Sequence, residues 1–201
     1  MFDSRVRRLI DPPLNRAAHS LAAWGAAPNG LTAAGLGFSV CAFAALFFRL
    51  YPLALLFILL NRLMDGVDGP VARVTGVTDL GGFYDILSDF IFYAGAIFFF
   101  AAGRPEMALA AGFLIYSFFG SGGSLLAAAI LAAKSGVPHE QQERKSFYYQ
   151  AGLMEGTETV FVLLLICLRP DWFPWIAYIF GALCWVTTLG RVRHAASRRT
   201  G

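Results

Sequence analysis

Charged residues are scarce in this sequence, and their scarcity excludes an ordinary soluble domain. Only 14% of the 201 residues are charged and 57% are hydrophobic, whereas soluble domains contain about 25% charged residues. Cysteine is also rare, and the three cysteines stand alone within apolar runs, which excludes a disulfide framework and a cysteine-rich metal site. The first residues are charged and include two prolines, so we expect no cleavable signal peptide.

The apolar residues gather in six long runs, and each run predicts a membrane-spanning helix. About 20 helical residues cross a hydrocarbon core of about 30 Å, and lipid offers no other hydrogen-bond partners to the backbone. The runs cover residues 31–48, 52–72, 81–102, 107–133, 150–168 and 172–190. Because no repeat or linker interrupts them, we predict a single all-α polytopic membrane domain over residues 1–201, with a six-helix bundle at 31–190.

The basic residues predict how the chain is oriented. Six spans place both termini on one side, and of the sixteen lysines and arginines only Arg49, Arg104 and Arg169 fall on the other side. Cytoplasmic loops are enriched in basic residues, so we expect both termini, including a basic tail at 191–201, to be cytoplasmic. The expected location is the inner (cytoplasmic) membrane of a bacterium.

Residues 1–27 precede the first run and predict an amphipathic helix. Seven apolar side chains recur there, mostly at three- and four-residue spacing: Phe2, Val6, Leu9, Ile10, Leu14, Leu21 and Trp24. In one interpretation this helix lies in the membrane interface and bends near Pro12 and Pro13. In the other, it packs on the protein as an ordinary amphipathic helix. The interfacial helix is our working prediction.

Four aspartates lie in otherwise apolar segments, and their spacing predicts a metal site. Asp65 and Asp68 of "DGVDGPVAR" share one helix face, and Asp85 and Asp89 of "GGFYDILSD" are one turn apart. If the two helices are neighbours, four carboxylates converge and repel one another unless a cation lies among them. A set of carboxylate oxygens favours Mg²⁺, Mn²⁺ or Ca²⁺ over Zn²⁺.

The residues around these aspartates predict that the metal meets a phosphate. Hard cations held by carboxylates often bind substrate phosphates. Four glycines leave room for a ligand to approach closely: Gly66, Gly69, Gly81 and Gly82. Arg73 follows Asp68 by about one turn and could bind a phosphate through two nitrogens. These residues favour metal-assisted phosphoryl chemistry at a membrane over a purely structural role.

The segment "DGVDGPVARVTGVTDLGGFYDILSD" resembles the signature of the CDP-alcohol phosphotransferases. That signature reads D-x-x-D-G-x-x-A-R, a spacer, and G-x-x-x-D-x-x-x-D. Eight positions match it: Asp65, Asp68, Gly69, Ala72, Arg73, Gly81, Asp85 and Asp89. The six runs and the "PNGLT" at 28–32 extend the resemblance over most of the chain. The seven-residue spacer between Arg73 and Gly81 is shorter than in many members, so the acceptor is not inferred from the family.

The resemblance implies a six-helix transferase, often a homodimer, with a polar cavity open to the cytoplasmic leaflet. Family members move a phosphatidyl or related group from a CDP-linked donor, such as CDP-diacylglycerol, to an alcohol and release CMP. By the matching positions, Asp65, Asp68 and Asp85 are expected to bind Mg²⁺ or Mn²⁺. Asp89 is expected to be the general base, and also a ligand where two ions bind.

The resemblance also implies a donor site. Gly69, Ala72 and Arg73 are expected to line the cytidine diphosphate site. Asn29 and Thr32, from the "PNGLT" segment, are assigned to the same site.

The acceptor alcohol is encoded less clearly. Arg144 and Lys145 favour a phosphorylated acceptor such as glycerol 3-phosphate or an inositol phosphate, or they serve as positive-inside anchors. Glu155 and Glu158 are one turn apart. They favour a hydroxyl-rich or amine-bearing acceptor, or they pair with arginines inside the bundle. Glycerol 3-phosphate is the first candidate.

Two other classes of function compete with the transferase. A divalent-cation transporter would use the aspartates as its transport site, but transporters often carry inverted repeats and broken helices, and this sequence has no repeat. A catalytically silent member would act as an interaction protein, and the intact signature argues against it. The expected partners are the CDP-linked lipid, a small alcohol, membrane lipids and a second copy of the chain, and no nucleic acid.

Overall fold

Helices form nearly all of the structure. The computed structural model describes residues 3–134 and 156–197, and within these ranges no strand occurs. In chain order the elements are α1 (Asp3–Ala23), α2 (Pro28–Phe47), α3 (Tyr51–Thr75), α4 (Asp79–Gly103), the 3-10 helix η1 (Pro105–Met107), α5 (Ala108–Lys134), α7 (Gly156–Leu168), the 3-10 helix η2 (Pro170–Trp172) and α8 (Phe173–Ser197). The all-α prediction is confirmed for the described ranges.

Each of the six predicted spans coincides with a helix, and four of these helices are long and apolar enough to cross a membrane. They are α2, α4, η1 with α5, and η2 with α8. Helix α3 has 25 residues but carries Arg62, Asp65 and Asp68. Helix α7 has 13 residues, and positions 150–155 of the predicted fifth span lie outside the described ranges. The four helices indicate an integral membrane protein, and the count of six spans stays a prediction.

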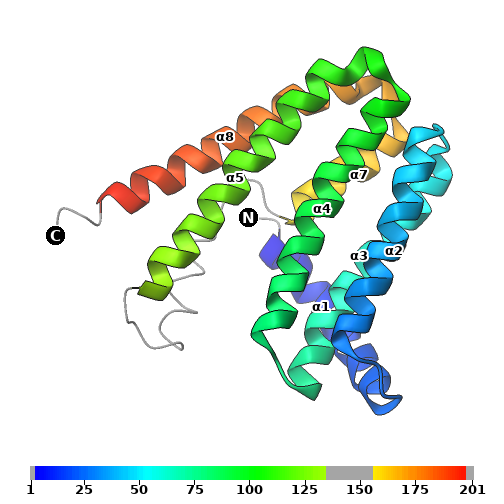
Figure 1. Ribbon diagram of the computed structural model, residues 1–201, viewed down its shortest axis with the longest axis vertical. Coiled ribbons are helices and arrows are strands. Elements are labelled where there is room, and N and C mark those ends of the chain that lie inside the picture. The colour runs from blue at the N-terminus through cyan, green and yellow to red at the C-terminus, as the bar shows by residue number, and fades with distance from the viewer. Residues whose placement is uncertain (1–2, 135–155, 198–201) are drawn as a thin grey trace.

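A short turn between α3 and α4 brings the two aspartate pairs to the same end of the molecule. Gly76 ends α3 with a φ of 125°, a conformation that favours glycine. Thr78 caps α4, because its hydroxyl accepts a hydrogen bond from the Gly81 amide at 3.0 Å. The chain therefore reverses at once, and α3 and α4 run antiparallel from this turn (Figure 1).

Helix α2 packs against both α3 and α4, and glycines permit the close contacts. A Cβ at Gly95 would overlap the ring of Phe43, and one at Gly103 would lie 2.9 Å from the Leu46 carbonyl oxygen. The largest fully buried apolar side chains surround these contacts: Ile58, Phe92, Ile97, Phe100, Leu114, Ile166 and Phe173. This core holds the helices that carry the aspartates in fixed relative positions.

Helices α5 and α8 form a second pair that runs side by side (Figure 1). A Cβ at Gly181 of α8 would lie 2.8 Å from Ser117 Oγ of α5, so the helices approach closely there. Arg191 of α8 donates a hydrogen bond to the Ser121 carbonyl oxygen of α5 at 2.8 Å. This pair contacts the other helices mainly through α4.

Helix α1 packs on the half of α3 that carries the signature. The helix is continuous through Pro12 and Pro13. Its buried Ala18 joins Val67 and Val71 of α3 in an apolar cluster, and Leu14 Cδ1 would lie 3.2 Å from a Cβ at Gly66. The described part of α1 thus packs on the protein, as one of the two sequence interpretations expects. Its placement in the membrane interface stays a prediction.

Candidate active site

The structure places the two aspartate pairs on successive helices, on either side of the turn that joins α3 to α4. Asp65 and Asp68 belong to α3, and Asp85 and Asp89 belong to α4. Asp68 is buried, with 5% of its surface exposed, whereas the side chains of Asp65 and Asp89 are 28% and 38% exposed. Asp85 is exposed. The four carboxylates therefore differ in exposure, from buried Asp68 to exposed Asp85.

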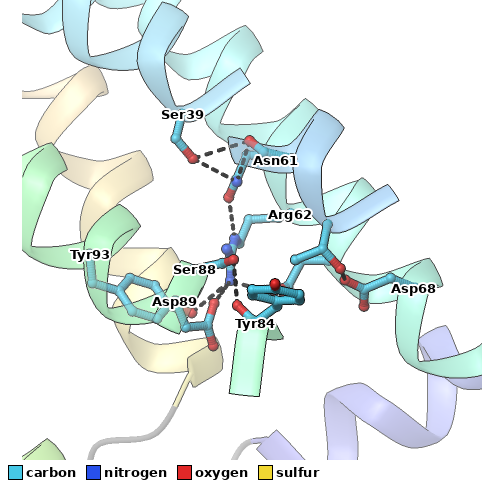
Figure 2. A network of polar contacts seen from close by, with 11 residues as sticks. Ser39, Asn61, Arg62, Asp68, Tyr84, Ser88, Asp89 and Tyr93 are labelled. Atoms are coloured by element: carbon cyan, nitrogen blue, oxygen red, sulfur yellow. Dashed lines mark hydrogen bonds and ion pairs between the residues drawn. The ribbon is translucent and has the colours of Figure 1, made fainter. Parts of the chain in front are cut away.

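One guanidinium joins the two helices at this site. Arg62 Nη1 donates to Asp65 Oδ2 at 3.2 Å and to Asp89 Oδ1 at 2.9 Å. The hydroxyl oxygen of Tyr93 lies 2.9 Å from the same nitrogen. Figure 2 shows Arg62 reaching from α3 toward Asp89 and Tyr93 of α4. The two halves of the signature therefore meet at a single cation.

A chain of buried polar groups holds this guanidinium. Arg62 Nε donates to Asn61 Oδ1 at 2.7 Å, and Asn61 Nδ2 donates to Ser39 Oγ and to the Gly35 carbonyl oxygen of α2, both at 2.9 Å. Arg62 Cζ also lies 4.4 Å from the centroid of the Phe92 ring, a distance typical of a cation–π contact. Three helices thus determine where the positive charge sits (Figure 2).

The "PNGLT" segment, at the start of α2, contacts both halves of the signature. Thr32 Oγ1 donates to Asp68 Oδ2 at 2.6 Å, and this bond is buried. Asn29 Oδ1 would lie 3.4 Å from a Cβ at Gly81, so the first turn of α2 also meets the first turn of α4. The structure therefore brings both residues of this predicted donor set to the aspartate end of α3 and α4.

The remaining donor residues lie along the last turns of α3. A Cβ at Gly69 would lie 3.8 Å from Arg73 Nη1, so the Arg73 guanidinium passes over the glycine. Ala72 is partly buried and Arg73 is exposed. Gly69 carries no side chain that would separate a bound phosphate from this guanidinium. The arrangement suits an anionic ligand at the open end of α3.

Of the four predicted acceptor residues, the structure describes only Glu158. Glu158 lies in the first turn of α7 and is partly buried. A Cβ at Gly156 would lie 3.6 Å from the Tyr93 hydroxyl, which places the start of α7 next to the Arg62 network. Arg144, Lys145 and Glu155 lie outside the described residues.

The donor chemistry of the aspartates fits a hard divalent cation, because every candidate ligand is a carboxylate oxygen. As the side chains are arranged, however, no three acidic, histidine or cysteine residues in the described ranges are grouped so that they could hold one ion. Arg62 lies between Asp65 and Asp89 and donates to one oxygen of each. The aspartates therefore have the chemistry of a metal site, but the described side chains are not grouped as one.

Arg62, Asn61 and Tyr93 are site residues that the sequence analysis does not identify. In the sequence, Arg62 counts only among the basic residues that set the orientation. One signal is present in the sequence: an arginine within an apolar run, one turn before Asp65, needs an anionic partner because charges in such segments are costly. Asn61 precedes Asp65 and Tyr93 follows Asp89 by four residues each. Helical spacing therefore places both on the aspartate faces, but it does not show that they meet Arg62.

The family can now be assigned. The model of the CDP-alcohol phosphatidyltransferase family matches residues 26–190. The chain belongs to this family. The match covers the "PNGLT" segment, both aspartate pairs and α2 through most of α8, and it confirms the resemblance seen in the signature.

Two relatives and one solved structure are similar to this chain. The chain is 48% identical over 193 residues to the inner membrane protein YnjF of Escherichia coli K12, covering 96% of this chain and 94% of YnjF. It is 33% identical over 101 residues to the archaetidylinositol phosphate synthase of Pyrococcus horikoshii, covering about half of each protein (50% and 54%). The crystal structure of the Mycobacterium tuberculosis phosphatidylinositol phosphate synthase PgsA1 with CDP-DAG bound superimposes with a TM-score of 0.71 at 15% identity, covering 90% of this chain and 92% of PgsA1. The last likeness establishes a shared fold.

Proposed function

We propose that this protein transfers a phosphatidyl or related group from CDP-diacylglycerol to an acceptor alcohol and releases CMP. The observation that carries the proposal is the meeting of Asp65 and Asp89 at one guanidinium nitrogen. The contact supports a single reaction centre built from both halves of the family signature. The bound CDP-DAG in the structure of PgsA1 supports the choice of donor.

Asp65, Asp68 and Asp85 would hold Mg²⁺ or Mn²⁺, as one ion or two, with Asp89 as a further ligand for the second. When bound, the ion would neutralise the donor diphosphate and stabilise the departing CMP. Thr32 fixes one oxygen of Asp68, so the buried ligand is already oriented. Such preorganisation lowers the cost of assembling the site.

Asp89 would act as the general base. The acceptor hydroxyl oxygen forms a bond to the phosphorus, the bond between that phosphorus and the CMP oxygen breaks, and the hydroxyl proton passes to Asp89. The partial exposure of Asp89 (38% of its side chain) leaves it accessible to a small alcohol. A carboxylate is a weak base toward an alcohol, so the proton moves late, as the phosphorus–oxygen bond develops.

Gly69, Ala72 and Arg73 would line the cytidine diphosphate site together with Asn29. Arg73 is exposed beside a residue without a side chain, which allows its guanidinium to bind a phosphate through two nitrogens. Thr32 would contribute to this site through Asp68 rather than by direct contact with the donor. Its hydroxyl lies 2.6 Å from that carboxylate and 3.2 Å from the Pro28 carbonyl oxygen.

The acceptor is the part of the reaction that needs a direct test. Glycerol 3-phosphate is our first candidate, with Arg144, Lys145, Glu155 and Glu158 as the residues to examine. Inositol phosphate is the alternative, because one relative is named an archaetidylinositol phosphate synthase.

We further propose an inner-membrane location, six spans, cytoplasmic termini and a homodimer. The inner-membrane relative YnjF supports the location.

The deciding experiment is metal-dependent CMP release by the purified full-length protein. CDP-diacylglycerol is offered with glycerol 3-phosphate, inositol phosphates, inositol, serine and glycerol, each with Mg²⁺, Mn²⁺ or excess chelator. CMP release and a matching lipid product with one acceptor would support the proposal. No CMP with any acceptor, combined with divalent-cation flux into vesicles, would favour a transporter instead. Absence of both activities would favour an interaction protein.

A further inference from the structure

Arg62 is a largely buried cation that contacts two carboxylates of the family signature. Its side chain is only 12% exposed, and it forms ion pairs with Asp65 and Asp89. It is not one of the eight signature positions. Its positive charge offsets part of the negative charge that Asp65 and Asp89 would otherwise present to a divalent cation.

The hydrogen-bond geometry limits what Arg62 can satisfy at one time. Three acceptors lie within 3.2 Å of Nη1: Asp65 Oδ2, Asp89 Oδ1 and the Tyr93 hydroxyl. A guanidinium Nη carries two hydrogens, so at any moment one acceptor goes without. The Tyr93 hydroxyl therefore competes with the two carboxylates for the hydrogens of Nη1, while Nε is bound to Asn61.

The charges at the site predict that Arg62 and a divalent cation compete for Asp65 and Asp89. Without a nearby cation, the carboxylates of Asp65 and Asp89 would repel each other in a partly buried site. Arg62 removes this repulsion by occupying one oxygen of each carboxylate. A divalent cation bound to the same two residues would meet the guanidinium's positive charge at short range.

We propose that Arg62 is an internal counter-ion that holds Asp65 and Asp89 together and competes with the divalent cation for them. The proposal rests on the metal dependence of the proposed function. Its consequence is that Arg62 sets how much free metal the site requires. Arg62 is a positioning residue, since it acts through the two aspartates and not on the reacting atoms.

The test is Mn²⁺ binding to the full-length protein in nanodiscs, followed by electron paramagnetic resonance. Ions bound to an Asp65→Asn/Asp89→Asn double variant are subtracted as background. Arg62→Met removes the charge but keeps an apolar side chain over Phe92, and we expect it to bind Mn²⁺ at least about tenfold more tightly. Arg62→Lys keeps the positive charge and should bind Mn²⁺ more weakly than Arg62→Met does. Arg193→Gln, an exposed arginine on α8, should bind as wild type does.

Tyr93→Phe tests the same idea with the opposite sign. It removes the third acceptor of Nη1 and keeps the ring against the guanidinium. Both hydrogens of Nη1 are then committed to the aspartates, so Mn²⁺ binding should weaken by a few-fold. This variant keeps the proposal testable if Arg62→Met does not fold.

Thermal unfolding separates competition from packing. If Arg62 is a counter-ion, Arg62→Met lowers the Tm mainly without metal, and saturating Mn²⁺ restores most of the loss because bound ligand stabilises the folded state. An equal Tm loss with and without Mn²⁺, together with Mn²⁺ affinity unchanged in Arg62→Met or Tyr93→Phe, would overturn the proposal and leave the transferase function intact. A wild-type protein that binds no Mn²⁺ above background would overturn this proposal and the metal-dependent function together.

Discussion

Thr32 and Asp68 form a buried hydrogen bond between α2 and α3, with Thr32 Oγ1 2.6 Å from Asp68 Oδ2. The threonine belongs to the "PNGLT" segment and the aspartate to the signature, 36 residues later in the sequence. This contact fixes the most buried of the four carboxylates. Removal of the Thr32 hydroxyl therefore tests whether this contact positions Asp68.

Thr32→Val keeps the shape of the side chain and removes the hydroxyl donor. The buried Asp68 oxygen then lacks its partner, which destabilises the protein by about 1–3 kcal/mol. Misplacement of a ligand should slow CMP release by about a hundredfold. The measurement is the initial rate of CMP formation at saturating metal. Thr32→Ser retains the donor and should stay near wild type, and a fully active Thr32→Val would remove Thr32 from the site.

Asp89→Asn tests the proposed general base. The amide has the shape of the carboxylate but cannot accept the acceptor proton, so CMP release should fall by about 10²–10⁴-fold. Binding of a CDP-lipid, measured by its protection against thermal unfolding, should persist. Asp79→Asn is the matched control, because Asp79 is an exposed aspartate in the first turn of the same helix. A wild-type rate in Asp89→Asn would show that another group takes the proton.

Gly95→Ala tests the close packing of α2 against α4. The new methyl group would overlap the Phe43 ring and lie 2.9 Å from its Cε2. That ring is buried and also stacks on Phe99, with the centroids 5.1 Å apart, so it cannot move away freely. We expect a loss of about 1–3 kcal/mol in unfolding free energy, measured by denaturation in detergent. Gly112→Ala is the control, since nothing lies within 4 Å of its Cβ position, and an equal effect at both glycines would contradict the packing argument.

Ala18→Asp tests whether α1 supports the signature half of α3. Ala18 is 1% exposed against Val67 and Val71, and an uncompensated carboxylate there costs about 3–5 kcal/mol. We expect α1 to separate from α3, so that limited proteolysis cleaves it faster and CMP release falls. Ala17→Asp places the same charge at an exposed neighbour and should change neither readout. Unchanged activity with a protease-sensitive α1 would show that the site works without this helix.

The helices and their order could be predicted from the sequence because their causes are local. Long apolar runs become helices in lipid whatever surrounds them, and Gly76 and Thr78 end one helix and begin the next through their own backbone and side-chain preferences. The grouping of Asp65 with Asp68, and of Asp85 with Asp89, follows from helical spacing alone. The family signature gives these residues their expected roles from the sequence alone.

Contacts between helices could not be predicted in this way, because they depend on how each helix is rotated and on which side chains reach across. Tertiary packing placed Arg62 between Asp65 and Asp89 and connected it through Asn61 to Ser39. It also directed Thr32 to Asp68, where the sequence suggested a role at the donor. The sequence by itself therefore determined which carboxylates the protein has and the helices that carry them. Only the tertiary structure decided which cation those carboxylates meet, because a counter-charge is defined by distance in space and not by spacing along the chain.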